Sequence, residues 1–256
     1  MTGAILPRDG SATDPASCAD AASVVTFNRL GRTSNILNEI NEQFVALAGS
    51  ATLPVLDIGC ATGVVALAAL EAGARVIAND VSAGHLAALA AAVPPPWEPR
   101  LTLDRRRFPD QLDFAAGSLA HVHASNLLNF LTGDEIDRGF DRIAGWLADG
   151  GMFLSMSGTP YARNVAPFIP DYEARRATGE RWPGYCTAIH TLSDDPTLRE
   201  LPPALHLLDP EVLARSATAA GLTVIEARFF HRRATPSYIA WDGRENVILI
   251  ARKDPA

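Results

Sequence analysis

The residues with the clearest chemical potential lie in one short stretch of the chain. The apolar run Val55–Ile58 is interrupted by Asp57 and leads into two glycines, Gly59 and Gly63. An alanine-rich segment with the composition of a helix, Val64–Ala72, follows directly. A strand that turns through glycines into a helix brings backbone N–H groups together with little steric cover. This stretch therefore predicts a ligand site at the end of a strand.

A second acid follows at the spacing that nucleoside sites use. Residues Ala74–Asp80 have the composition of a second strand, and Asp80 stands at its end, about 20 residues after the loop. A carboxylate in this position can accept hydrogen bonds from both hydroxyls of a ribose. The loop and Asp80 together predict a nucleoside-bearing cofactor at the C-terminal edge of a parallel sheet.

The spacing of the small residues distinguishes between cofactors. A dinucleotide fingerprint requires glycines at the positions of Gly59, Ala61 and Val64, and Val64 fails where helix and strand must approach closely. This disfavours an NAD(P) enzyme. The loop instead resembles that of class I S-adenosylmethionine (SAM) dependent methyltransferases, with Asp57, Gly59, Ala61 and Gly63 at the motif positions and Ala61 in place of the middle glycine. An acid such as Asp57 would repel a diphosphate but can organise the loop near an ammonium group.

The resemblance extends over residues 54–253, and three further passages carry it: 124–136, 147–154 and 209–226. It implies an α/β fold with a doubly wound, seven-stranded sheet that is mostly parallel and has an antiparallel C-terminal strand. An N-terminal helical cap and a lid insertion after strand five complete the expected fold. Periodicity predicts strands at 55–58, 75–79, 101–103, 121–125, 152–156, 222–230 and 246–253, and helices at 64–72, 83–92, 135–148 and 210–220. The expected divisions are a mobile tail (1–22), cap helices (23–50) and a SAM-binding domain (51–256) that contains the lid (157–208).

The resemblance also implies which residues contact SAM and its product, S-adenosylhomocysteine. Many members carry an acid after strand three that meets the adenine; here Phe108 stands near that position, with Asp110 as an alternative. No metal is expected. The implied cofactor contacts are Asp57, Gly59, Cys60, Ala61, Gly63, Asp80, Val81, Phe108, Ser125 and Asn126.

The segment Ser157–Leu208 has no long periodic pattern and is rich in proline and aromatic residues. An irregular insertion of this length at the ligand-binding edge predicts a lid over the acceptor, or alternatively a dimerisation arm. Tyr161, Trp182 and Tyr185 are candidates for an aromatic wall that holds a planar acceptor, or for packing within the lid. His190 is the preferred candidate base, because an acceptor that must lose a proton needs one. His121 and His123, alternate residues of strand four, are expected to be packing residues.

Composition limits the partners. Among 256 residues, 48% are apolar and the formal net charge is −7, which argues against a nucleic-acid partner. The short basic clusters 105–107 and 231–233 are either solvated edges or contacts to an anionic small molecule. No apolar run is long enough to span a membrane, and the N-terminus lacks the pattern of a secretory signal, so a cytoplasmic location is expected. Three cysteines form neither a disulfide framework nor a metal-binding spacing.

These observations predict a SAM-dependent methyltransferase (EC 2.1.1) that methylates O, N or C of a small molecule by in-line displacement. Ser125–Leu128 replaces the Asn/Asp-Pro-Pro-Tyr/Phe signature of enzymes that methylate base amines. The expected partner is a small, partly aromatic biosynthetic acceptor, with a homodimer as one possibility. Two alternatives stay open: an enzyme of the same fold that uses SAM for a non-methylating reaction, and a non-catalytic SAM-binding partner protein.

Overall fold

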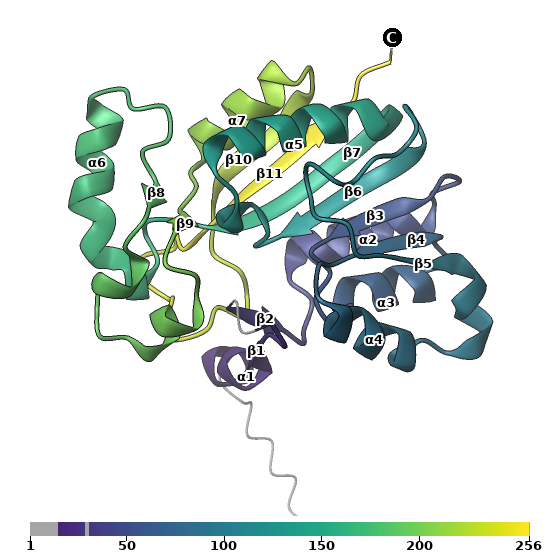
Figure 1. The fold of residues 1–256 in the computed structure, drawn as a ribbon, viewed down its shortest axis with the longest axis horizontal. Coiled ribbons are helices and arrows are strands. Elements are labelled where there is room, and N and C mark those ends of the chain that lie inside the picture. Colours follow the sequence, from purple (N-terminus) through teal and green to yellow (C-terminus); the bar gives the residue numbers. More distant parts are fainter. Residues whose placement is uncertain (1–14, 29–30, 256) are drawn as a thin grey trace, which may run out of the picture.

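A seven-stranded sheet forms the centre of the molecule in the computed structural model, which describes residues 15–28 and 31–255 (Figure 1). The strand order is β5-β4-β3-β6-β7-β11-β10, and β11 runs antiparallel between β7 and β10 while the other neighbours pair in parallel. The predicted doubly wound sheet with its antiparallel C-terminal strand is therefore confirmed. The strands are β3 (Val55–Ile58), β4 (Val76–Asn79), β5 (Leu101–Asp104), β6 (Leu119–Ser125), β7 (Leu147–Gly158), β10 (Thr223–Phe230) and β11 (Asn246–Arg252).

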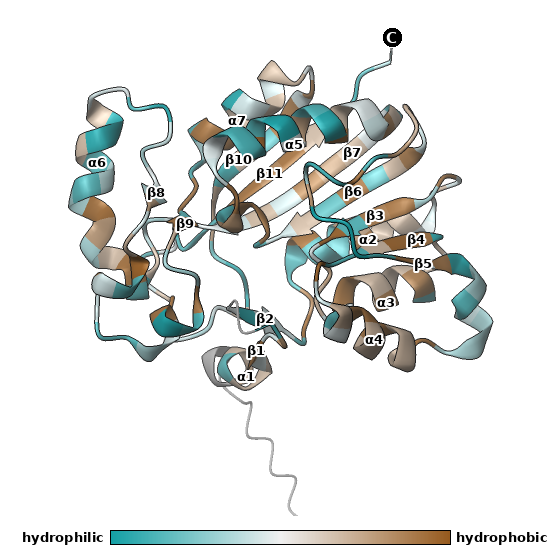
Figure 2. Ribbon diagram, viewed as in Figure 1, coloured by the Kyte–Doolittle hydropathy of each residue, from teal (hydrophilic) through white to brown (hydrophobic). Residues whose placement is uncertain are grey.

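Helices cover both faces of the sheet and create two hydrophobic cores. Helices α5 and α7 lie on one face, and α2, α3 and α4 lie on the other (Figure 1). Phe140 of α5 meets Phe153 of β7 edge-on, with ring centroids 5.4 Å apart. Strands β3 and β11 are buried along nearly their whole length, as expected of strands covered on both faces. Figure 2 shows that β11 is mainly hydrophobic. The helices are α2 (Glu39–Gly49), α3 (Val64–Glu71), α4 (Ala83–Ala92), α5 (Gly133–Trp146) and α7 (Pro210–Ala219), and a 3-10 turn, Pro95–Arg100, follows α4.

Local sequence signals fix where these helices begin. Thr132 and Glu135 form a capping box at the start of α5, and the side chains of Ser82 and Asp209 accept backbone N–H groups at the starts of α4 and α7. None of the helices within residues 15–28 and 31–255 is both long and apolar enough to cross a bilayer.

The N-terminal region differs from the predicted tail and cap helices. Residues 1–14 of the expected tail lie outside the described residues, while helix α1 (Pro15–Ala22) leads into a short hairpin of β1 (Ser23–Val25) and β2 (Arg32–Ser34). A single helix, α2, follows. The side chain of Asn38 caps its first turn and so fixes where it begins. The segment expected to form cap helices, residues 23–50, is thus a hairpin followed by one helix.

The insertion after β7 has more regular structure than its sequence predicted. It contains helix α6 (Ile169–Ala177), the short hairpin of β8 (Tyr185–Cys186) and β9 (Leu205–His206), and its own hydrophobic cluster around Phe168, Tyr172 and Leu198. Pro167 in the preceding 3-10 turn and Pro170 in the first turn of α6 concealed its periodicity, since Pro is accepted in the first turn of a helix. Short 3-10 turns make up the rest: Leu128–Phe130 before α5, then Arg163–Phe168, Ile189–Thr191 and Pro196–Glu200.

His206 anchors the insertion and should make stability depend on pH. It packs edge-on against the rings of Trp182 and Tyr185, at centroid distances of 5.0 and 5.5 Å, and its Nε2 is buried without a partner in the described residues. Burial lowers the pKa of His206 to about 4. The unfolded chain takes up a proton near pH 6.5 and the native state does so only near pH 4. As the pH falls from about 6.5 to about 4, the free energy of unfolding should therefore decrease by up to about 1.4 kcal/mol per pH unit.

Replacement of His206 by Gln removes this titration. Urea unfolding at pH 7.5 and pH 5 should show a smaller loss of stability on acidification for H206Q than for the wild type. Equal losses for the two proteins would contradict the assignment to His206.

Candidate functional site

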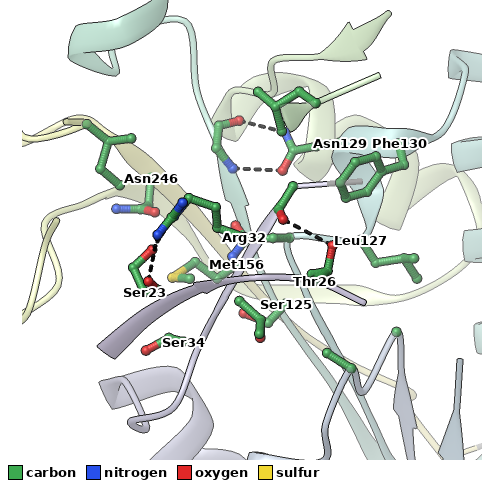
Figure 3. A pocket seen from close by; sticks show the side chains of 18 of the residues that line it. Ser23, Thr26, Arg32, Ser34, Ser125, Leu127, Asn129, Phe130, Met156 and Asn246 are labelled. Carbon is green, nitrogen blue, oxygen red and sulfur yellow. Dashed lines mark hydrogen bonds between the residues drawn. The ribbon is translucent and has the colours of Figure 1, made fainter. Parts of the chain in front are cut away.

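A single cavity of about 550 Å³ opens at the C-terminal ends of β3 and β4 and continues toward the insertion (Figure 3). This is the topological switch point of the sheet, because β4 lies on one side of β3 and β6 on the other. The loop after β3, the end of β6, the N-terminal hairpin, the insertion and the β10–β11 loop all contribute to the wall. The cavity therefore has two parts: one beside the glycine loop and one between the added segments.

The loop after β3 has a backbone that only small residues permit. Gly59, Ala61 and Gly63 have φ values of 70°, 48° and 84°, all in the left-handed region. A Cβ atom on Gly63 would lie 2.4 Å from Leu89 Cδ1. The loop thus comes close to α4 and leaves its N–H groups near the cavity.

Asp80 ties this loop to the end of β4. It is buried; its Oδ2 accepts the N–H of Ala61 at 3.0 Å and its Oδ1 accepts the N–H of Ser82 at 2.8 Å. His85 Nδ1 lies 3.1 Å from Asp80 Oδ1, and His85 Nε2 accepts the backbone N–H of Phe27. The acid expected to hold a ribose is therefore fixed by two backbone N–H groups, and His85 lies beside it without a hydrogen bond from Nδ1.

Asp57 is held by a second buried histidine. His123 Nδ1 lies 2.7 Å from Asp57 Oδ1, and Asn41 Nδ2 lies 3.0 Å from His123 Nε2. Because Asn41 Oδ1 accepts the N–H of Asn38, its amide nitrogen must face the imidazole and donate to it. His123 consequently carries its proton on Nδ1 and donates it to Asp57. The predicted packing residue of strand four is thus a positioning residue for the loop acid.

The second carboxylate oxygen of Asp57 is available to a ligand in this part of the cavity. Asp57 lines the cavity and is only 2% exposed, and its Oδ2 has no hydrogen-bond partner among the described residues. A buried carboxylate oxygen without a partner is costly, and a ligand ammonium group would satisfy it. The acids at both strand ends therefore fit the amino-acid and ribose parts of SAM.

Most predicted cofactor residues lie around this part of the cavity. Its wall includes nine of the ten: Asp57, Gly59, Cys60, Ala61, Asp80, Val81, Phe108, Ser125 and Asn126. Gly63 is the exception and acts through the backbone at the start of α3. Phe108 is buried against Trp146, whereas the alternative, Asp110, is half-exposed, binds Arg138 and does not line the cavity. Burial raises the pKa of the Cys60 thiol, which keeps it protonated.

Three segments that are distant in sequence meet over the second part of the cavity. Arg32 of the N-terminal hairpin forms an ion pair of 2.9 Å with Glu200 of the insertion. It also donates a hydrogen bond to Ser23 (Figure 3). Ser23 Oγ lies 3.1 Å from the hydroxyl of Tyr238 in the β10–β11 loop. Asn129 clamps the start of the insertion, because its amide bonds both to Gly158 and to the carbonyl of His206.

The residues predicted to bind the acceptor lie elsewhere. Tyr161, Trp182, Tyr185 and His190 do not line the cavity. Tyr161 donates to Glu173 and belongs to the core of the insertion, and Trp182 and Tyr185 pack against His206. The four side chains thus serve the insertion itself. His190 is exposed and its Nε2 lies 2.7 Å from the carbonyl of Leu201, so the geometry does not support it as the base.

Sequence reasoning missed several cavity residues. Arg32, Asn41 and Tyr238 stand outside any motif, and Asn129 lies in the passage 124–136 without a predicted role; nothing in the sequence indicates the contacts of these residues. Arg232 belongs to the basic cluster 231–233, which is the one sequence signal that points to any of these cavity residues.

Comparisons with known proteins agree with this fold and loop. Residues 55–151 match the family described as a methyltransferase domain, and no curated protein matches the chain significantly. The CcbJ methyltransferase from Streptomyces caelestis is 22% identical over 84% of this chain and 94% of its own, with a TM-score of 0.58. A SAM-dependent methyltransferase from Methanosarcina mazei is 16% identical over 80% of this chain and 93% of its own, with a TM-score of 0.57. The glycopeptide N-methyltransferase MtfA, in complex with S-adenosylhomocysteine, is 18% identical over 83% of this chain and 88% of its own, with a TM-score of 0.55.

At these identities the solved structures are similar in fold, and the family match covers the loop, Asp80 and strands β3 to β7 up to Gly151. Together with the strand order, it defines a class I SAM-dependent methyltransferase domain. The chain accordingly contains a methyltransferase domain at residues 55–151.

Proposed function

We propose that this enzyme methylates a small molecule, which it encloses in the second part of the cavity. One observation carries the proposal: the cavity of about 550 Å³ is continuous from Asp57 and Asp80 to the hairpin, the insertion and the β10–β11 loop. Its volume is in the range of sites for small ligands. The contacts of Arg32 with Ser23 and Glu200 close the wall over it, which favours a small acceptor over a macromolecular one.

In this proposal the first part of the cavity holds the cofactor. Asp57 Oδ2 accepts the ammonium group of the amino-acid moiety, and Asp80 accepts the ribose hydroxyls beside its bonds to Ala61 and Ser82. Phe108 and Val81 offer apolar surface to the adenine. When bound, SAM supplies a methyl group on a positively charged sulfur, which a nucleophile can accept directly.

The chain's contribution is to position the acceptor and to exclude water. Holding two reactants in line can supply a large part of a rate enhancement. His85 and His123 are the histidines that line the cavity in the described part of the chain; His123 is hydrogen-bonded to Asp57, and His85 Nε2 already accepts the N–H of Phe27. Burial alone would raise the pKa of Glu245, but its hydrogen bonds from His231 and backbone N–H groups lower it. The proposed acceptor is therefore nucleophilic without a strong protein base.

The fold neighbours add support from small-molecule chemistry. One of them acts as a glycopeptide N-methyltransferase.

The test is a turnover assay with a panel of small amines, phenols and carboxylic acids, read out as S-adenosylhomocysteine and as methylated product by mass spectrometry. Calorimetry with SAM, S-adenosylhomocysteine and NAD precedes it. Transfer to at least one acceptor by the wild type, and its loss in D80N, is the expected result. SAM consumption without a methylated product would favour the non-methylating alternative, and binding without turnover would favour a non-catalytic role.

A further inference from the structure

One arginine of the cavity wall makes no ion pair with the residues that the structure describes. Three arginines line the cavity in the described part of the chain: Arg32, Arg107 and Arg232. Arg32 forms an ion pair with Glu200 at 2.9 Å, and Arg107 forms one with Glu135 at 2.6 Å. The guanidinium of Arg232 has no hydrogen bond or ion pair among these residues, and its Nε is buried without a partner.

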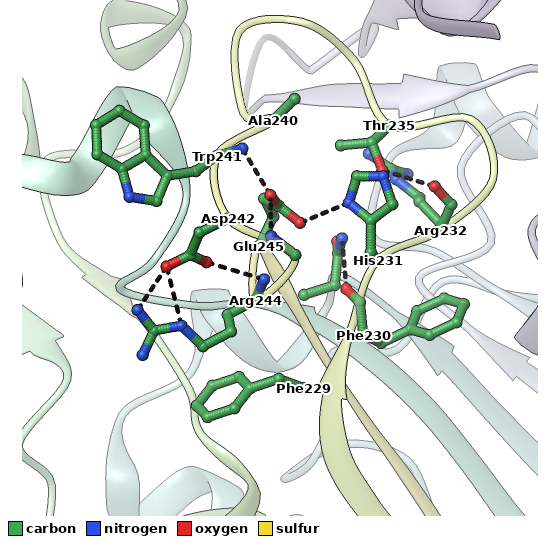
Figure 4. A network of polar contacts seen from close by, with 12 residues as sticks. Phe229, Phe230, His231, Arg232, Thr235, Ala240, Trp241, Asp242, Arg244 and Glu245 are labelled. Atoms are coloured by element: carbon green, nitrogen blue, oxygen red, sulfur yellow. Dashed lines mark hydrogen bonds and ion pairs between the residues drawn. The ribbon is translucent and has the colours of Figure 1, made fainter.

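This arrangement is costly for the protein alone. Arg232 is only 9% exposed, and burial lowers its pKa. Its hydrogen bond within the chain is made by its backbone carbonyl, which accepts the Thr235 hydroxyl at 2.8 Å (Figure 4). A buried, unpaired guanidinium forfeits hydration without recovering it from a partner. The cost indicates that its partner is a ligand.

The charged groups around Arg232 restrict what that ligand can be. Tyr238, Glu39 and Glu245 are near enough to favour the charged guanidinium, although neither glutamate reaches ion-pair distance. Glu245 is committed elsewhere: Oε1 accepts the N–H groups of Trp241 and Gly243, and Oε2 lies 3.0 Å from His231 Nδ1 (Figure 4). Both glutamates repel an anion, and Glu39 Oε2 is itself buried without a partner among the described residues, so a dianion is disfavoured more than a monoanion.

We propose that Arg232 binds a carboxylate group of the acceptor and is the main determinant of acceptor class. This inference deepens the proposed function and rests on it. A guanidinium presents parallel N–H groups that match a carboxylate in a bidentate pair, and Nε is one of the free donors here. The negative neighbours select the monoanionic carboxylate over a phosphate monoester. The acceptor is then a small carboxylic acid that is methylated at another of its atoms or at the carboxylate itself.

The test compares carboxylates with uncharged molecules of the same shape. The probes are acetate, benzoate and phenylacetate with their amides, and phenyl phosphate, titrated by calorimetry into the protein saturated with S-adenosylhomocysteine. The wild type should bind at least one acid about tenfold or more tightly than its amide, a difference of about 1.4 kcal/mol. The ratio of the affinity for the acid to the affinity for its amide should fall to about one in R232M. It should be partly kept in R232K, because Lys retains the positive charge but lacks the parallel N–H groups of a guanidinium.

A matched control is available in the neighbouring residue. Arg233 is exposed, pairs with Glu39 and Glu42 and does not line the cavity, so R233M should keep the wild-type ratio. The melting temperature separates recognition from structure: R232M without probe should melt at or above the wild-type temperature, whereas a structural arginine would lower it on removal.

Each outcome bears on the proposal. It is overturned if no acid binds more tightly than its amide, if phenyl phosphate binds most tightly, or if R232M retains the preference or melts well below the wild type. Binding of S-adenosylhomocysteine to the wild type is measured first and tests the proposed function separately. That binding should be unchanged in R232M.

Discussion

Replacement of Asp57 by Asn should weaken the binding of both SAM and S-adenosylhomocysteine by roughly 30- to 150-fold, or about 2–3 kcal/mol, with little effect on folding. The carboxylate is buried, one oxygen is bound to His123 at 2.7 Å, and the other is free at the cavity. A charged hydrogen bond to a ligand ammonium group would be lost with the negative charge.

The direction of the buried hydrogen bonds makes this substitution severe. Asn41 donates to His123 Nε2, so His123 must donate from Nδ1 to the residue at position 57. An Asn there satisfies His123 with its oxygen and must turn its NH₂ group toward the cavity. The ammonium group would then meet a donor in place of an acceptor, while the fold keeps the same shape and the same hydrogen bond.

Calorimetry with three ligands checks the assignment. 5′-Methylthioadenosine has the adenine and ribose but lacks the amino-acid group, so its affinity should be the same for D57N and the wild type. Asp104 ends β5, pairs with Arg106 and does not line the cavity, so D104N is a matched control that should bind S-adenosylhomocysteine normally. An equal loss of all three ligands in D57N would mean that Asp57 supports the loop and not the ammonium group.

The sheet and the cofactor side of the cavity could be predicted because their signals are local. The loop from Asp57 to Gly63 and the acid at Asp80 each belong to one strand-turn unit, so residue type and spacing are enough. The switch in strand order then brings both acids to one crevice. The network behind Asp57 was out of reach, because Asn41 and His123 are 82 positions apart.

The acceptor side could not be predicted for a related reason. Aromatic residues of the insertion, such as Tyr161 and Trp182, have the same composition whether they face a ligand or each other, and here they form the insertion's own core and its contact with His206. The walls of the cavity come instead from polar residues such as Arg32 and Tyr238, whose positions depend on tertiary contacts between distant segments.

Each of the two cofactor acids lies beside a buried histidine, and each histidine is bound by a residue of the N-terminal region. Asp57 is oriented by His123, which is bound by Asn41 of α2, and Asp80 adjoins His85, which accepts the N–H of Phe27. Residues before β3 therefore contact both ends of the site through buried imidazoles. This is the physical role of a region that the sequence predicted only as a cap.

Replacement of Gly63 by Ala should have the largest effect on stability of any change in the loop. The added methyl group would lie 2.4 Å from Leu89 Cδ1 and 2.9 Å from its Cδ2 and Cγ, inside a fully buried cluster. The left-handed φ of 84° adds about 1–2 kcal/mol for an alanine. Overpacking of a core adds about 1–3 kcal/mol, so we expect a total loss of about 3 kcal/mol in the free energy of unfolding.

Gly73→Ala separates the two contributions to that loss. Gly73 also has a positive φ, 102°, but no atom lies within 4 Å of the position of its Cβ, so only the backbone cost applies. Urea unfolding should therefore show G63A to be about 2 kcal/mol less stable than G73A. In the double variant G63A/L89A the steric part should disappear, so the two losses should be less than additive. Strictly additive losses, or equal stability of G63A and G73A, would show that α4 moves away from the loop without cost. S-Adenosylhomocysteine binding should weaken at least about tenfold in G63A and stay at the wild-type level in G73A, because only the former displaces the loop that Asp57 leads into.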